Sequence, residues 1–131
     1  GGAGCAGCHR PPEFDIDPNT RNNGVIAAIS GGIDLTNTRS PTLRDLVNPA
    51  GVPNGGLMHN GAFESLEAVV EHYNRIPEDN SQLDQRLRRP GGGRQNLNFS
   101  DAQKADLVDF LKTLTGSTVY TDSRWSNPFA L

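Results

Sequence analysis

Residues that build metal and redox sites are scarce in this sequence. Its 131 residues include only two cysteines and one methionine, which excludes a framework of several disulfides. No apolar run approaches the roughly 20 residues that a transmembrane helix needs. Hydrophobic residues make up 34% of the chain and the mean hydropathy is −0.54, which is low for a globular domain. We therefore expect a disulfide, a metal or a large cofactor to complete the core.

An excess of positive charge is also missing. Fifteen acidic and 12 basic residues give a formal net charge of −3, so we expect no nucleic-acid partner. No secretory signal is visible at the start of the chain. One basic cluster is present, and we favour a solvated face over a docking patch for an acidic partner. Its members are Arg86, Arg88, Arg89 and Arg94.

Both cysteines lie in one segment, Cys5-Ala6-Gly7-Cys8-His9. A disulfide between them would close a very small loop and would constrain the unfolded chain little. A thioredoxin-like pair needs a βαβ context that the sequence lacks, and a zinc site needs further ligands at a familiar spacing. Cys-x-x-Cys-His is the signature of covalent haem attachment. We therefore predict one haem c, bound through Cys5 and Cys8, with His9 as an iron ligand.

The single methionine, Met58, is the candidate for the second iron ligand. It lies in the glycine-rich segment GGLMHNG rather than on a helix face, which argues against a role as a core filler. Methionine opposite histidine is the axial pair of an electron-transfer haem. His59 and His72 are the rival ligands, and a bis-histidine pair would lower the reduction potential relative to histidine and methionine.

Two more residues are candidates for contacts around the haem. Arg44 is expected either to pair with a haem propionate or to be a solvated arginine, with equal weight. The backbone carbonyl of Pro11 or Pro12 is expected to accept the N–H of the His9 imidazole, which would fix the ring and tune the iron.

Helical periodicity is clear in two segments. Apolar residues at helical spacing predict amphipathic helices over residues 65–76 and 100–116. A capping box of Ser100 and Gln103 marks the start of the second helix. A shorter helix is predicted over residues 40–48, with a serine N-cap and a proline at its first position. The fold is therefore expected to be all-α, with long ordered loops.

Four segments of the sequence, in order, carry a family resemblance. They are CAGCHRPPEF, SPTLRDLV, LMHNGAFESLEAVVEHYN and DLVDFLKTLTG, within residues 5–116. Together they resemble the C-terminal haem domain of the di-haem cytochrome c peroxidase (MauG-like) family. Asn60 replaces the aspartate of that family's Met-His-Asp-Gly segment. The resemblance implies a class I cytochrome c fold, with Met58 as the distal ligand of a high-potential, electron-transferring haem.

The sequence departs from that family in two ways. One Cys-x-x-Cys-His motif leaves no site for the family's second, peroxidatic haem, and the family's calcium site needs both domains. The segment Gly1–Gly4 is too short for the helix that usually precedes the motif, and an uncovered apolar face on the last helix would favour self-association. We predict that residues 1–131 are a single c-type cytochrome domain, cut from a longer protein, with a core over about 5–116 and a tail over 117–131.

The expected function is outer-sphere electron transfer through one haem, with a redox partner protein or a fused redox domain. We favour an electron-transfer domain over an enzyme. The alternative is a peroxidase-type domain in which Met58 dissociates to admit peroxide. The cytochrome c resemblance implies that haem is attached outside the cytoplasm, so a periplasmic or secreted location is expected, with no membrane span.

Overall fold

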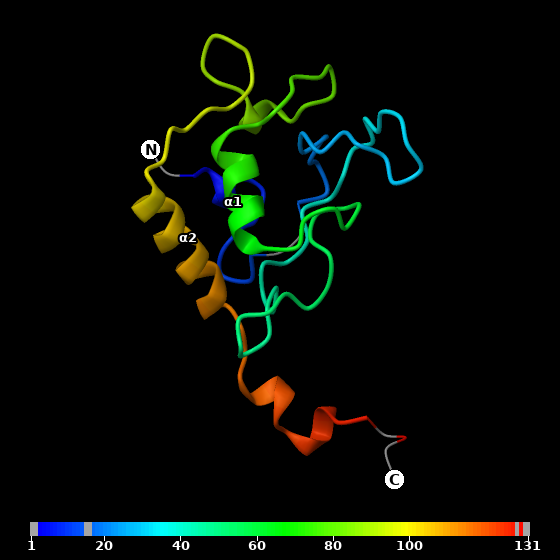
Figure 1. The fold of residues 1–131 in the computed structure, drawn as a ribbon, viewed down its shortest axis with the longest axis vertical. Coiled ribbons are helices and arrows are strands. Elements are labelled where there is room, and N and C mark those ends of the chain that lie inside the picture. The colour runs from blue at the N-terminus through cyan, green and yellow to red at the C-terminus, as the bar shows by residue number, and fades with distance from the viewer. Residues whose placement is uncertain (1–2, 15–16, 128, 130–131) are drawn as a thin grey trace.

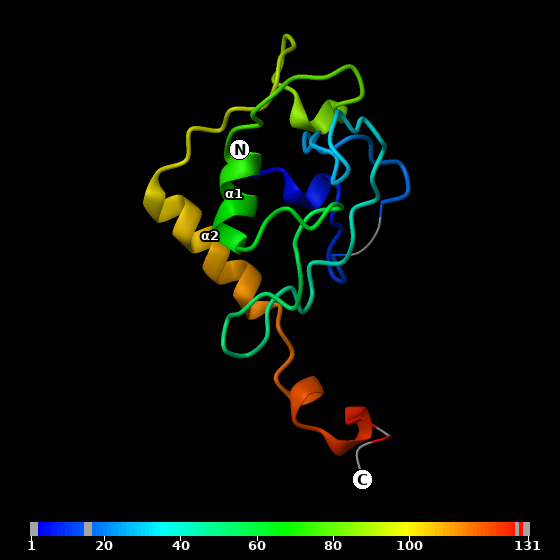
Figure 2. The same cartoon turned by 45° about the vertical axis from the view of Figure 1, so that its right-hand side comes forward.

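The protein has a loop-rich body, two packed helices and a tail that leaves the body at one end (Figures 1 and 2). The computed structural model describes residues 3–14, 17–127 and 129. Among these residues there are two α-helices, α1 (Leu66–Asn74) and α2 (Asp101–Thr113). Four single turns of 3-10 helix complete the helical elements: η1 (Cys5–Gly7), η2 (Gln85–Leu87), η3 (Thr118–Tyr120) and η4 (Ser123–Trp125).

The prediction of an all-α fold is wrong. Helix α1 has nine residues and α2 has 13, and six isolated β-bridges tie together the loops that make up most of the described chain. These loops satisfy their backbone groups by pairing with one another and with polar side chains. The fully buried Asn22 is an example, because its side-chain amide donates to the carbonyls of Asp34 (3.4 Å) and Thr36 (3.2 Å).

The helix predicted over residues 40–48 is absent, and turns and bends occupy its place. Asp45 has a φ of 56°, which a right-handed helix cannot contain. Its carboxylate accepts the N–H of Gly116 at 2.8 Å. Val47 pairs with Pro53 in an antiparallel bridge instead of continuing a helix. A long-range contact therefore overrides the local helical signal.

The two longer helices are confirmed, with shorter bounds than predicted. Ser65 caps α1 by accepting the N–H of Ala68 at 3.1 Å. The predicted capping box starts α2: the Ser100 hydroxyl accepts the Gln103 N–H, and the Gln103 side chain accepts the Ser100 N–H. Both caps satisfy N–H groups that a helix start leaves without partners.

The hydrophobic core lies where α1 and α2 pack against the loop that contains Val47. Val108 and Leu111, from the predicted apolar face of α2, are 3% and 7% exposed. Burying an aliphatic side chain of this size stabilises a fold by about 1.5–3 kcal/mol. The buried cluster consists of Val47, Leu66, Val70, Val108 and Leu111.

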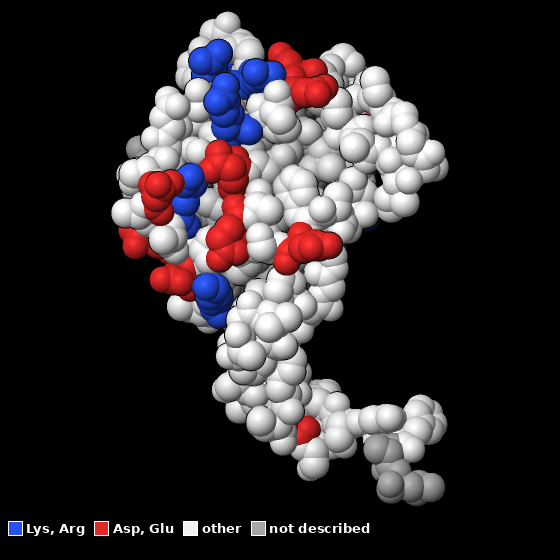
Figure 3. Space-filling view, in the orientation of Figure 1, with Lys and Arg blue, Asp and Glu red and all other residues white. Residues whose placement is uncertain are grey.

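The outer side of α2 carries charge as well as apolar surface. Charged side chains of both signs gather over the two helices in Figure 3. Lys104 lies 2.9 Å from both the Glu71 and the Asp101 carboxylate oxygens, and Ala105 beside it is exposed. These residues line a groove of about 420 Å³. Self-association through the last helix stays a prediction.

After α2 the chain leaves the body (Figures 1 and 2). The hydroxyl of Tyr120 accepts a hydrogen bond from the Asn54 side chain at 2.6 Å. Beyond this contact Trp125 is 67% exposed. Within the described part of the chain, no helix has the length and apolar character needed to cross a membrane.

Candidate cofactor site

The Cys-x-x-Cys-His motif folds as one tight turn. Gly4 has a φ of 74° and precedes the 3-10 turn η1. The N–H groups of Cys8 and His9 both donate to the carbonyl of Cys5, at 3.1 and 2.8 Å. Cys5 and Cys8 are half-buried free thiols, so the structure contains no disulfide between them. Two thiols and an imidazole thus project from a single turn.

Burial raises the pKa of both thiols above the usual value. The positive charge of Arg86 opposes this rise at Cys8. Both cysteines are therefore protonated at neutral pH, and Cys8 is the one with a cation facing it.

The His9 imidazole is held by one hydrogen bond to a distant residue. Nδ1 lies 2.8 Å from the carbonyl oxygen of Pro41. A carbonyl only accepts, so Nδ1 carries the proton and Nε2 keeps its lone pair. Burial lowers the pKa of His9, although hydrogen bonds to the carbonyls of Pro41 and Phe14 oppose this shift. The ring is therefore neutral, which is the form that binds metals.

The prediction that Pro11 or Pro12 accepts this N–H is wrong. The Pro12 carbonyl instead accepts a hydrogen bond from Nη2 of Arg44 at 2.9 Å. The Arg44 Nε also lies 3.1 Å from a carboxylate oxygen of Glu13. Arg44 is thus engaged with the loop that follows His9, and its contact with a haem propionate stays a prediction.

We define residues 5–14 as the attachment loop and residues 40–44 as the clasp, because each clasp residue bonds to that loop. Polar groups of residues 40–44 thus bond to the attachment loop and not to one another as in a helix. The five bonds join Ser40 Oγ to the Cys8 carbonyl (2.9 Å), the Pro41 carbonyl to His9 Nδ1 (2.8 Å), Thr42 Oγ1 to the Glu13 carbonyl (3.2 Å), the Leu43 N–H to the Phe14 carbonyl (3.1 Å) and Arg44 Nη2 to the Pro12 carbonyl (2.9 Å).

An ion network with two buried carboxylates supports the attachment loop from its other side. Arg86 Nη1 lies 2.6 Å from Asp17 Oδ2 and donates to the Gly7 carbonyl at 2.7 Å. Its Nε and Nη2 donate to the two carboxylate oxygens of Asp84, both at 2.8 Å. Asp17 is 3% and Asp84 4% exposed. The network joins the turn of the two cysteines to η2.

The interpretation of the arginine cluster as a solvated face is wrong for Arg86. Its hydrogen bonds lower the pKa of the Asp84 carboxyl to about 2 and also lower that of Asp17. Sequence reasoning missed this site because Asp17, Asp84 and Arg86 show no spacing that predicts their contact. A Cβ added at Gly7 would lie 3.4 Å from Cδ of Arg86, so the motif's glycine accommodates this approach.

Met58 lies at the start of a strained turn. Its φ is 66°, and a non-glycine residue in this left-handed region costs about 1–2 kcal/mol. The turn is closed by a bridge between Leu57 and Phe63, and the Gly61 N–H donates to the Met58 carbonyl at 3.1 Å. We call residues 57–63 the Met58 turn. Strain of this kind persists only where surrounding contacts hold the backbone.

Two side chains tie the Met58 turn to the loop of residues 27–34. Asn60 Nδ2 donates to the Ala27 carbonyl at 2.9 Å. His59 Nε2 lies 3.4 Å from a carboxylate oxygen of Asp34. His59, a rival ligand, is therefore engaged with Asp34 on this loop.

His72, the other rival ligand, is 6% exposed on α1. Its Nε2 lies 2.8 Å from the carbonyl oxygen of Asn23, so that nitrogen carries a proton and has no lone pair for a metal. Burial lowers the pKa of His72. A Cβ at Gly24 would lie 2.9 Å from Ile76 and 3.4 Å from His72 Nε2, so glycine is needed for this approach. Nε2 of His72 is therefore used in a structural contact.

Tyr73 connects the cysteine turn with the Met58 side. Burial raises the pKa of its phenol, and the nearby thiol groups of Cys8 and Cys5 raise it further. A hydrogen bond with the Asn23 side chain acts in the opposite direction. The Asn23 amide is in turn 3.9 Å from the sulfur of Met58. Asn23 thus links the Met58 sulfur to the Tyr73 phenol.

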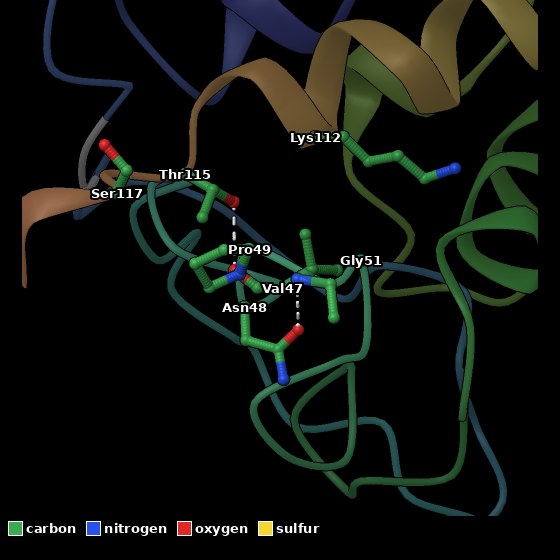
Figure 4. Close-up of a pocket in the computed structure, with 8 residues that line it drawn as sticks. Val47, Asn48, Pro49, Gly51, Lys112, Thr115 and Ser117 are labelled. Atoms are coloured by element: carbon green, nitrogen blue, oxygen red, sulfur yellow. Dashed lines mark hydrogen bonds between the residues drawn. The ribbon is translucent and has the colours of Figure 1, made fainter. Parts of the chain in front are cut away.

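The rest of the described chain contains a cavity but no cluster of metal-binding side chains. Residues 3–14, 17–127 and 129 contain no group of three or more His, Cys, Asp or Glu side chains that could hold a metal ion. A cavity of about 510 Å³ lies between the end of α2 and residues 47–51 (Figure 4). Its Asn48 carboxamide accepts two backbone N–H groups, and its Thr115 hydroxyl donates to the Val47 carbonyl.

Known proteins resemble this chain over most of its length. No protein-family model matches it. Methylamine utilization protein MauG of Methylorubrum extorquens is 32% identical over 123 residues, covering 87% of this chain and 31% of that protein. The MauG protein of Methylophilus methylotrophus is 25% identical over 125 residues, covering 89% of this chain and 34% of that protein. The chain therefore spans about a third of the length of these relatives.

A solved structure shares the fold. It is the crystal structure of a MauG-like protein associated with microbial copper homeostasis, with a TM-score of 0.63 and 23% sequence identity. The match covers 97% of this chain and 44% of that chain. The loop-rich architecture is thus one that occurs in another solved protein.

Proposed function

Because this chain resembles the MauG-like family, as its sequence predicts and its relatives confirm, we propose that it holds one covalently bound haem c and transfers electrons through it. The observation that carries the proposal is the turn of Cys5, Cys8 and His9. Two free thiols and a neutral imidazole with Nε2 available form the donor set that a haem c needs. When bound, the haem would supply one-electron chemistry by cycling between ferric and ferrous iron.

The attachment loop positions the proximal ligand. His9 donates its Nδ1 proton to the Pro41 carbonyl, which fixes the ring and directs Nε2 away from the clasp. Burial keeps the imidazole neutral. Arg86 holds the Gly7 carbonyl and so keeps the two thiols on a fixed turn. Together these contacts hold the proximal side of the proposed haem site in place.

Met58 is the second axial ligand in this proposal. The bridge and hydrogen bonds of the Met58 turn hold its backbone at a positive φ. His59 is engaged with Asp34, and Nε2 of His72 is occupied by the Asn23 carbonyl. Both rivals would have to leave these contacts to bind iron, which favours Met58. A histidine and methionine pair suits electron transfer better than activation of peroxide.

The remaining parts of the proposal concern context. We propose that residues 1–131 act as one haem domain, with its core over about 5–116. It would exchange electrons with a redox partner protein or with a fused redox domain. Haem attachment to paired cysteines implies a periplasmic or secreted location.

Visible absorption spectra of the haem-loaded protein test the ligand pair. We expect a sharp α-band after reduction and a weak far-red band in the oxidised state from the bond between sulfur and iron. Met58→Ala should lose the far-red band and bind carbon monoxide, because its sixth position is open. His59→Ala is the matched control from the same turn and should keep the band. A Met58→Ala spectrum identical to the parent would overturn Met58 as ligand, and a high-spin parent would favour the peroxidase-type alternative.

Acid–acetone extraction tests the covalent attachment. The parent should keep its haem in the protein fraction, and the double variant Cys5→Ala/Cys8→Ala should lose all of it. Haem that stays with the double variant would show that the attachment assignment is wrong.

A further inference from the structure

Besides its hydrogen bond with Tyr73, the side chain of Asn23 has two further directed contacts. Its Nδ2 lies 3.9 Å from the sulfur of Met58, and its Oδ1 accepts the backbone N–H of Val25 at 3.0 Å. An N–H group can only donate, so the atom that faces Val25 must be the amide oxygen. The NH2 group therefore faces the sulfur. The hydrogen bond from Val25 therefore determines which way the Asn23 amide is oriented.

The backbone of Asn23 is also fixed. Its carbonyl accepts a hydrogen bond from Nε2 of the buried His72 at 2.8 Å. The His72 ring also packs edge-on against Phe63, with ring centroids 5.4 Å apart. Phe63 pairs with Leu57 and closes the Met58 turn. His72 thus contacts both the residue that faces the sulfur and the turn that carries the sulfur.

Helix α1 fixes the separation of Asn23 and Met58. His72 belongs to α1, whose neighbouring residues Leu66 and Val70 are in the core. The amide and the thioether are therefore placed relative to one helix, although they come from loops 35 residues apart in the chain.

We propose that Asn23 is a positioning residue for the second axial ligand. Its amide N–H takes one lone pair of the Met58 sulfur and leaves the other lone pair for iron. This inference rests on the proposed function. A thioether sulfur is a weak acceptor, so the contact orients the ligand at low cost and does not compete with a metal bond.

Two consequences separate this role from a merely structural one. A donor to the sulfur withdraws electron density from it, which disfavours the ferric state and raises the reduction potential. The contact also restrains rotation of the Met58 side chain. Without it the sulfur should leave the iron more often, and a competing ligand should enter faster.

Asn23→Asp removes the amide donor and keeps the oxygen that accepts the Val25 N–H. Asn48→Asp is its matched control, because Asn48 Oδ1 likewise accepts backbone N–H groups, those of Ala50 at 2.9 Å and Val52 at 3.1 Å. The control variant adds the same charge and lies outside the Met58 turn, so it leaves the sulfur contact intact. Asn23→Ser is a second, uncharged variant that keeps a side-chain oxygen near the Val25 N–H.

The measurements are the reduction potential, the far-red band and the rate of carbon monoxide binding by the reduced, haem-loaded protein. We expect both Asn23 variants to lower the potential, weaken the band and speed carbon monoxide binding by about fivefold, as loss of one hydrogen bond would. Asn48→Asp should leave the band and the rate near the parent values. Thermal melts identify any variant that is unfolded. If one Asn23 variant is unfolded, the other Asn23 variant provides the test.

Equal values for Asn23→Ser, Asn48→Asp and the parent would overturn this inference and leave the proposed function standing. Absence of the far-red band from the parent protein would overturn Met58 as ligand, and this inference with it.

Discussion

The attachment loop and the Met58 turn are held by different kinds of interaction. The attachment loop has the five bonds of the clasp on one side and the charged network of Arg86 on the other. The Met58 turn is held mainly by neutral hydrogen bonds and packing, and it contains a residue at positive φ. The difference indicates that the attachment loop is held more firmly than the Met58 turn.

Arg86→Ala should destabilise the side of the attachment loop and cause the largest loss in the free energy of unfolding. It leaves Asp84 buried without its cation, and loss of one partner of a buried ion pair costs about 3 kcal/mol. Arg89→Ala is the control, because Arg89 belongs to the same run but pairs with neither Asp17 nor Asp84. Chemical denaturation of the haem-free proteins measures both free energies of unfolding. Equal values for the two variants would contradict the comparison of the two halves.

Gly24→Ala should weaken the Met58 side by about 2 kcal/mol, because it adds steric overlap to the cost of a positive φ. Its new Cβ would meet Ile76 at 2.9 Å and press on His72. Gly31→Ala is the matched control: Gly31 has a nearly equal φ of 86°, but nothing lies within 4 Å of its Cβ position. The control should lose about 1 kcal/mol.

The far-red band of the haem-loaded Gly24→Ala protein should also weaken, since His72 and Asn23 would move. If the Gly24→Ala protein is less stable but its band is unchanged, the loss of stability does not affect the position of Met58. That outcome would contradict the proposal that His72 supports both stability and ligand positioning.

Lowering the pH should destabilise the side of the attachment loop, and this is the smallest of the expected effects. The pKa of Asp84 is lowered from 3.8 to about 2 in the folded protein, so its contribution is present above pH 4 and is lost as the pH falls toward 2. After allowance for solvent screening we expect a loss of about 1 kcal/mol. Asp84→Asn should be less stable than the parent at pH 5 and should show a flatter decline between pH 4 and pH 2. Parallel pH profiles would contradict this assignment.

Short-range patterns were sufficient to predict the two longer helices. Ser65 and the capping box of Ser100 and Gln103 act within one helical turn of their partners. The motif of Cys5, Cys8 and His9 is equally local, so its compact turn follows from spacing. The helix predicted over residues 40–48 failed for the opposite reason. Its serine and proline signals were outweighed by bonds to residues about 30 positions earlier in the chain.

The contacts around the site could not be read from spacing. Arg86 looks like one member of a surface cluster, yet it faces Asp17, which lies 69 positions away. Asn23 has no motif of its own, although its position in an asparagine-glycine turn beside Gly24 is a signal that the backbone there takes an unusual conformation.

The sequence by itself determined the donor set and the two helix starts, because thiols, imidazole, thioether and caps are properties of residue type and close neighbours. The tertiary structure alone decided that Pro41 orients His9, that Arg86 pairs with the buried carboxylates of Asp17 and Asp84, and that Asn23 faces the sulfur of Met58. These contacts join loops far apart in the chain. They form because buried polar groups require partners wherever the fold can supply them.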